Sequence, residues 1–242
     1  MAETFVAILT AHLLGDFIFQ TEWMIERKRW TWVLVLHAAI VALTSYLLLG
    51  TFHWRILLAI LLTHFFMDAI QAHYLSGSLA SSLVDQFVHL AVLLALAWCF
   101  PDTAKNGWWI SRVNPDLSRW YFASLTFISG VILCVPAGGA LIAKAIGRFT
   151  DEIRGSDFAG LTRGGQYIGW LERSLVMLLL LMDQPNGIGF LIAVKSVLRF
   201  GDIKEPSQRK VAEYIIIGTF LSFGWALSIS TLTQKALRHW MP

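Results

Sequence analysis

Histidine and aspartate residues recur one helical turn apart in the N-terminal part of the chain. They form the pairs His12/Asp16, His64/Asp68 and, in reversed order, Asp85/His89, with a fourth histidine, His37, between the first two pairs. Residues i and i+4 share one face of an α-helix, so each pair would present its imidazole and carboxylate together. Both groups are ligands of divalent zinc, manganese and iron. We predict that these side chains bind one or two such ions.

The chemistry that such a site supports is hydrolysis. A bound divalent ion lowers the pKa of a water, which then attacks a phosphoester, ester or amide, here of a lipid-like substrate. Asp16 and Asp85 are the candidate general bases. Gln20, one further i+4 step from Asp16, and Gln86, directly after Asp85, are candidates for orienting the substrate. Gln71 is more typical of an ordinary polar group at a helix end.

The elements that must position these residues are apolar helices. The chain has 242 residues, of which 56% are hydrophobic and 14% are charged, whereas soluble domains carry about 25% charged residues. Apolar runs of about 17–25 residues are typical of transmembrane helices. We read such runs at 3–21, 31–50, 55–75, 84–100, 120–147, 166–183, 187–200 and 213–234. The fold class predicted is all-α, a polytopic transmembrane bundle of about seven to eight membrane helices, in which segment 187–200 either spans or is re-entrant.

The polar connections suggest three parts. Residues 1–100 would be a four-helix membrane half that carries the His/Asp cluster, 101–165 a helix at 120–147 with flanking polar connections, and 166–242 the C-terminal membrane helices. The glycine-rich connection 148–165 is the predicted hinge. The net charge of +3 is scattered, which argues against nucleic acid as a partner and leaves membrane lipid as the expected one. The oligomeric state is left open.

Positive charge predicts the orientation in the membrane. The segments 26–29, 148–163 and 204–210 carry basic residues and fall on one side if the eight apolar segments alternate, and this side is expected to be cytoplasmic. With a rise of about 1.5 Å per residue, the seven candidate ligands then share one layer near the cytoplasmic face. Polar residues placed at random would not share a depth.

Other interpretations of the cluster remain open. Each aspartate could accept a hydrogen bond from a histidine and stabilise a polar bundle core. Haem ligation is less favoured, because haem does not need an aspartate one turn from each histidine. The same ligands could also serve a non-enzymatic metal or proton carrier, a sensor, or a structural membrane protein. Transport is disfavoured mildly, because the outer halves of the first four helices are almost wholly apolar.

The C-terminal segments hold a second polar set, Glu172, Lys195 and Arg199. Buried charges in a bilayer usually pair, so we expect Glu172 to lie beside Lys195 or Arg199 on two helices. The pairing would either join helices or form a cationic pocket for the head group of a substrate.

Several of these stretches resemble an uncharacterised bacterial membrane family, known as domain of unknown function 3307. The matching text is AHLLGDFIFQTEWM, HA at His37, THFFMDAIQ and DQFVHL, followed by GWLERSLV, AVKSVLRFGD and EYIIIGTFLSF. The resemblance implies that the His/Asp/Gln residues form a set, but it implies no activity. A loose similarity to membrane-bound metal-dependent hydrolases is an analogy of fold alone.

Overall fold

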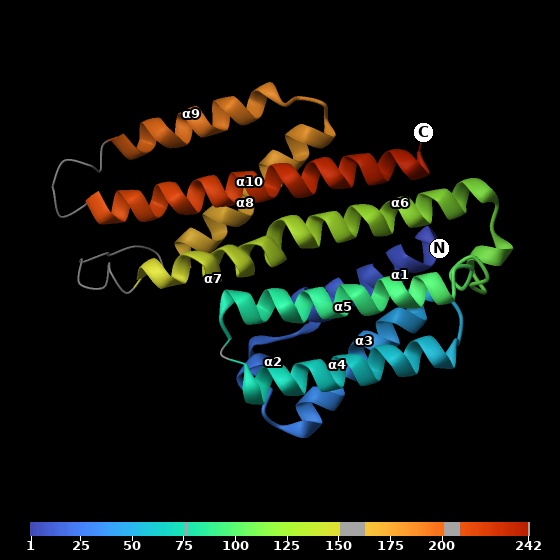
Figure 1. Ribbon diagram of the computed structural model, residues 1–242. Helices are drawn as coiled ribbons and strands as arrows, with labels where there is room; N and C mark the ends of the chain where they lie inside the picture. The colour runs from blue at the N-terminus through green and yellow to red at the C-terminus, as the bar shows by residue number, and fades with distance from the viewer. Residues whose placement is uncertain (76, 151–162, 201–208, 242) are drawn as a thin grey trace. The chain divides into compact units, whose positions relative to one another are not determined.

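The computed structural model describes residues 1–75, 77–150, 163–200 and 209–241, and of residues 148–150, 198–200 and 209–211 it describes the backbone only. These residues form helices joined by short connections (Figure 1). Chain contacts divide the protein into two compact units. Unit 1 comprises Met1–Ile132 and Leu237–Pro242, and unit 2 comprises Leu133–Ala236. The predicted hinge lies mainly in 151–162, outside the described residues, and the three-part division remains a prediction.

Unit 1 is a bundle of long helices around α1. Its helices are α1 (Ala2–Leu14), the π-helix η1 (Gly15–Phe19), α2 (Glu22–Glu26), α3 (Thr31–Leu49), α4 (Trp54–Tyr74), α5 (Leu79–Cys99), the short η2 (Ile110–Arg112) and α6 (Pro115–Ile132). Helix α1 packs against α3, α5 and α6, and α4 joins α3 to α5. The four helices α1, α3, α4 and α5 therefore close a ring in which each helix packs against two others.

Local signals in the sequence determine where these helices begin and end. Gly50 adopts a left-handed conformation with φ of 65° at the C-cap of α3, which glycine does without steric cost. Ser78 accepts a hydrogen bond from the backbone N–H of Ser81 at the N-terminus of α5, so that α5 begins at Leu79 rather than near 84 as predicted. The first turn of α5 therefore precedes its apolar run.

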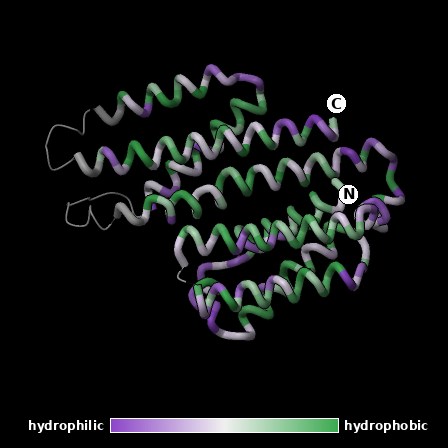
Figure 2. Tube along the Cα trace, viewed as in Figure 1, coloured by the Kyte–Doolittle hydropathy of each residue, from purple (hydrophilic) through white to green (hydrophobic). Residues whose placement is uncertain are grey.

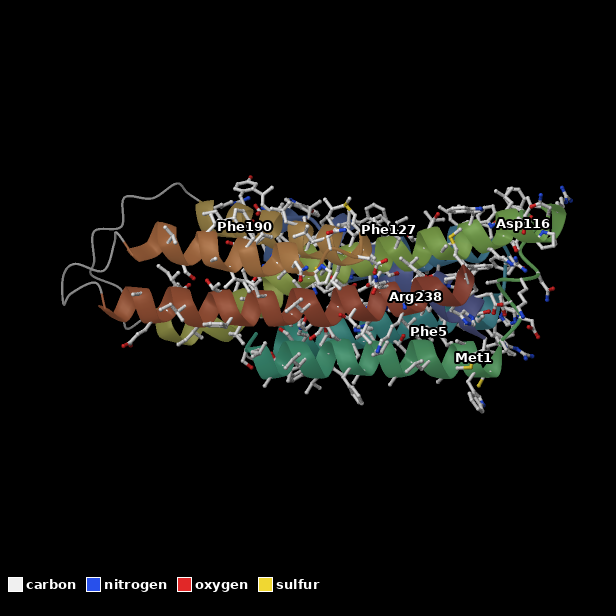
Figure 3. The ribbon with its side chains drawn as sticks, turned by 90° about the horizontal axis from the view of Figure 1, so that it is seen from above. Met1, Phe5, Asp116, Phe127, Phe190 and Arg238 are labelled. Carbon is white, nitrogen blue, oxygen red and sulfur yellow. The ribbon has the colours of Figure 1, made fainter. Side chains whose placement is uncertain are left out.

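The interior of unit 1 is apolar toward one end and polar toward the other. The N-termini of α1 and α6 lie at one end (Figure 3), where Thr4 Oγ1 donates to the carbonyl of Pro101 at 2.8 Å. We call this the Pro101 end and the opposite one, which holds α2, the Lys28 end. Apolar residues such as Ile8, Ile56 and Leu93 form a core between α1, α4 and α5. Hydrophobic residues dominate the helices and hydrophilic ones gather in the connections (Figure 2).

Six helices in the described part of the chain are long and apolar enough to cross a membrane. They are Ala2–Phe19, Thr31–Leu49, Trp54–Tyr74, Leu79–Cys99, Pro115–Gly147 and Ala212–Trp240. The chain is a membrane protein, and the predicted all-α polytopic bundle is confirmed. Two predicted membrane helices, α8 (Gly164–Leu181) and α9 (Asn186–Phe200), are not among the six. Helix α9 is short, and α8 carries Glu172 and Arg173 within its 18 residues.

Unit 2 contains η3 (Leu133–Ala137), α7 (Gly138–Thr150), α8, α9 and most of α10 (Arg209–Trp240). Pro136 lies inside the π-helix η3, and because proline has no N–H, the helical hydrogen-bond ladder is interrupted there. Side chains donate to two carbonyls of this π-helix: Trp225 Nε1 donates to Leu133 at 2.9 Å and the Arg173 guanidinium donates to Val135 at 3.0 Å. The buried arginine thus has a structural role.

Candidate metal centre

The structure brings the seven predicted ligands together inside the ring of α1, α3, α4 and α5. Six of them are 1–4% exposed: His12, His37, His64, Asp68, Asp85 and His89. The seventh, Asp16, has 11% of its side chain exposed. All lie about one to three helical turns from the Lys28 end. The seven residues, which come from four helices, therefore converge at one depth as predicted, and their role as metal ligands remains a prediction.

Asp16, His37 and His64 form the tightest group. Asp16 Oδ1 lies 3.3 Å from His37 Nε2 and 3.4 Å from His64 Nε2. Metal–ligand bonds of about 2.0–2.1 Å place neighbouring ligand atoms about 3.0–3.4 Å apart. Both distances from Asp16 Oδ1 are therefore those of neighbouring ligands of one ion, and the three residues each offer a ligand atom within 4.8 Å of the others.

A second group shares Asp16 with the first. One ligand atom from each of His12, Asp16 and His89 lies within 4.8 Å of the others. His12 Nε2 is 3.8 Å from Asp16 Oδ2, the oxygen that faces away from His37 and His64. The groups also meet where His12 Nδ1 lies 3.1 Å from His64 Nε2. Asp16 is thus the residue common to both possible ion positions.

Gln86 links the ligands by hydrogen bonds. Its Nε2 donates to Asp16 Oδ2 at 3.0 Å and to Asp85 Oδ2 at 3.3 Å, and its Oε1 lies 3.2 Å from His12 Nε2. Two carboxylates require the NH₂ group on their side, so the amide oxygen must face His12. His12 then carries its proton on Nε2 and turns the lone pair of Nδ1 toward His64. Such a partner fixes the tautomer of a metal-binding histidine.

Lys28 joins the cluster from the connection that follows α2, and sequence reasoning missed it. Its Nζ donates to Asp68 Oδ1 at 3.1 Å and to Gln71 Oε1 at 3.5 Å. The other oxygen of Asp68 lies 3.4 Å from His37 Nε2. Lys28 belongs to a basic run that we had used only to orient the chain, and a pairing across 40 positions leaves no local signal.

Several buried atoms of the cluster have no hydrogen-bond partner among the described residues. They are Asp16 Oδ1, Asp68 Oδ2, Asp85 Oδ1 and both ring nitrogens of His37 and His89. A buried polar atom without a partner costs about 1–3 kcal/mol. Asp16, His37 and His89 also supply ligand atoms to the two groups described above. The donor set therefore fits a divalent ion. Histidine–aspartate hydrogen bonds are the other interpretation, since Asp16 Oδ1 lies 3.3 Å from His37 Nε2 and 3.4 Å from His64 Nε2.

Gly15 and the π-helix η1 position Asp16. A Cβ on Gly15 would lie 2.5 Å from Val41 Cγ2, so glycine permits the close approach of α1 to α3. A π-helix adds a residue to the turn and is frequent at functional sites. The helix ends at Phe19, and Gln20 follows in an extended conformation. Gln20 therefore does not continue the helical face of His12 and Asp16 as we predicted, and its buried Nε2 has no partner among the described residues.

The predicted pair in the C-terminal segments is present in unit 2. Lys195 Nζ donates to Glu172 Oε2 at 2.7 Å, and both side chains are about one-fifth exposed, at 19% and 21%. The pairing of Glu172 with Lys195 is confirmed. Arg199 lies in α9, but its side chain is outside the described residues. The role of these residues toward a head group remains a prediction.

A known protein family matches the N-terminal part of the chain. Residues 4–114 match the model of a family described as protein of unknown function (DUF3307). The matched residues include all seven candidate ligands, Lys28 and Gln86. The C-terminal stretches that we had compared with the same family lie outside the match. No curated protein and no solved structure matches the chain.

Proposed function

We propose that this membrane protein, whose residues 4–114 match that family of unknown function, is a metal-dependent hydrolase of the bacterial cytoplasmic membrane. It would act on a lipid-like substrate near the cytoplasmic interface. The observation that carries the proposal is the convergence of buried imidazole and carboxylate atoms at ligand spacing, several of them without hydrogen-bond partners. Zinc, manganese or iron(II) suits this mixed set.

The roles of individual residues follow from their contacts. Asp16, His37 and His64 would hold the ion, and His12 and His89 lie close enough to complete its ligands. The bound ion would supply an acidified water and polarise the bond to be cleaved. Asp85 is the better candidate for general base, because Asp16 belongs to both ligand groups and Asp85 Oδ1 has no hydrogen-bond partner among the described residues. Gln20 is proposed to orient the substrate.

The surroundings of the Lys28 end support a substrate from the membrane. Trp23, Trp30 and Trp32 are 42–54% exposed and lie beside one another, with ring centroids 5.3 Å and 6.1 Å apart. Exposed tryptophans at helix ends are typical of the membrane–water interface. The cluster lies about one to three turns deeper than this end. A lipid with its head group at the interface would thus present the linkages just below that head group at the depth of the cluster.

One observation favours a second function. The ring nitrogens and carboxylates of the cluster are almost fully buried, which suits a protein that holds or carries a metal ion or proton without catalysis. Such a protein would bind the same metal and lack hydrolytic activity. The two functions are therefore separated by turnover and not by metal content.

The test uses full-length protein purified in detergent without chelators. After supply of each divalent metal, we expect elemental analysis to find bound metal and a panel of phosphoester, ester and amide lipids to show metal-dependent hydrolysis. His64→Ala should lose both. His73→Ala is the matched control, since this exposed histidine is on the same helix and its ring nitrogen Nδ1 lies 3.0 Å from the Ala69 carbonyl, away from the cluster. Metal binding without hydrolysis would favour the metal carrier, and wild type without metal would exclude both the hydrolase and the metal carrier.

A further inference from the structure

The Lys28 ammonium occupies a cation position at the edge of the cluster. It lies between two oxygens, Asp68 Oδ1 at 3.1 Å and Gln71 Oε1 at 3.5 Å, and its side chain is 20% exposed. Carboxylate and amide oxygens are also ligands of hard divalent cations. The Lys28 ammonium thus lies where Asp68 Oδ1, the oxygen that is not directed at His37, could hold a metal ion.

The negative charges of the cluster outnumber its positive charges unless a further cation is bound. Asp16, Asp68 and Asp85 supply three negative charges, and metal-binding imidazoles are neutral. In the part of the chain that the structure describes, Lys28 is the one lysine or arginine within 4 Å of these carboxylates. The remaining charge is minus two, which one divalent ion neutralises. Two ions would leave a buried excess of two positive charges, and such an excess is costly among apolar helices.

The hydrogen bonds of Gln86 also disfavour the binding of a second ion. The atoms of His12 and Asp16 that lie farthest from the first ligand group, Nε2 and Oδ2, are the atoms engaged by the Gln86 amide at 3.2 Å and 3.0 Å. A second ion bound to them would have to break both hydrogen bonds. The contacts that fix the histidine tautomer therefore remove ligands from the second position.

We propose that the centre binds a single divalent ion and that the Lys28 ammonium takes the place of a second one. The inference rests on the proposed metal binding and narrows it from one or two ions to one. Lys28 is then a positioning residue: it neutralises Asp68 and holds that carboxylate with its other oxygen toward His37. Removal of the ammonium should open its position, between Asp68 Oδ1 and Gln71 Oε1, to a metal ion.

The experiment measures metal per folded chain in detergent at saturating zinc or manganese. Wild type should bind one ion, and Lys28→Met should bind two, because the cluster regains a negative charge and two free oxygen ligands. The double variant Lys28→Met/Asp68→Asn, which removes one charge of each sign, should return to one ion. Lys28→Arg should also bind one. Arg29→Met is the control for loss of a neighbouring positive charge, since Arg29 is exposed, and it should bind one.

The outcomes separate the two proposals. Wild type with two ions would overturn the single-ion inference and leave the metal-dependent function standing, as would Lys28→Met with one ion at unchanged affinity. Wild type with no ion would overturn both. If Lys28→Met does not fold, the wild-type count and the charge-balanced double variant still decide the question.

Discussion

Gln86 Oε1 lies 3.2 Å from His12 Nε2, and this contact determines which nitrogen of His12 is available to a metal. The NH₂ group of the same amide faces the carboxylates of Asp16 and Asp85. The histidine proton therefore points at the amide oxygen, and the lone pair of Nδ1 points toward His64, 3.1 Å away. One glutamine thus orients three residues of the cluster.

Gln86→Ala should weaken metal binding without removing a ligand. We expect the affinity to fall about 10–100-fold, which is typical when the hydrogen-bond partner of a metal ligand is lost. Titration of metal-free protein with zinc in detergent measures the change. Gln166→Ala, at an exposed position of α8, is the control and should bind as wild type. An unchanged affinity for Gln86→Ala would contradict the tautomer argument.

Removal of a direct ligand should have a larger effect than removal of an amide. His64→Ala and Asp16→Asn are each expected to lower metal content and any hydrolytic activity together, because both residues belong to the tightest ligand group. Gln20→Ala should spare the metal and lower turnover, because an amide is a weaker ligand better suited to positioning. Elemental analysis is made on monodisperse protein, with Asp116→Asn, an exposed carboxylate, as the control. Loss of metal in Gln20→Ala would show that our assignment of its role is wrong.

Chelation should destabilise unit 1. A ligand that binds only the folded state stabilises it by about 2.7 kcal/mol when its concentration is 100-fold above Kd. Treatment with a chelator should therefore lower the Tm in detergent, and excess divalent metal should restore it. In His64→Ala the chelator should change the Tm much less. An equal Tm of wild type with and without metal would argue against an ion at the cluster.

Gly15→Ala should separate α1 from α3. The new Cβ would lie 2.5 Å from Val41 Cγ2, and overpacking of this kind costs about 1–3 kcal/mol. The same shift should move Asp16 away from His37 and weaken metal binding. Gly15→Ala/Val41→Ala should recover part of both losses. Gly224→Ala is the control, because no atom lies within 4 Å of its added Cβ, and a stable Gly15→Ala with full metal affinity would contradict the prediction.

The ion pair Glu172–Lys195 should couple α8 to α9. Its 2.7 Å contact is largely shielded from solvent, and a double-mutant cycle with Glu172→Gln and Lys195→Met should give a coupling of about 0.5–3 kcal/mol. Thermal unfolding in detergent measures it. The exposed pair Arg119–Asp116, whose atoms are 3.6 Å apart, is the comparison and should give about 0.5 kcal/mol or less. Equal coupling in both pairs would show that burial adds nothing here.

The helical ligand pairs were predictable because their information is local. His64 and Asp68 lie one turn apart on any α-helix, whatever surrounds them. The apolar runs, the all-α bundle and the shared depth of the ligands follow from the same periodicity and from the rise of a helix. The charge pair of Glu172 with Lys195 was also predictable, because a charge inside an apolar segment requires a partner.

Only the tertiary structure decided how the pairs combine. Asp16 is shared by two ligand groups because the π-helix and the close packing at Gly15 bring it between α3 and α4. Lys28 meets Asp68 across 40 positions, and Gln86 meets Asp16 across 70. Contacts between distant residues depend on the packing of whole helices, which a periodicity of 3.6 residues does not specify. The sequence by itself therefore determined the donors and their depth, whereas packing determined their partners, their tautomers and their balance of charge.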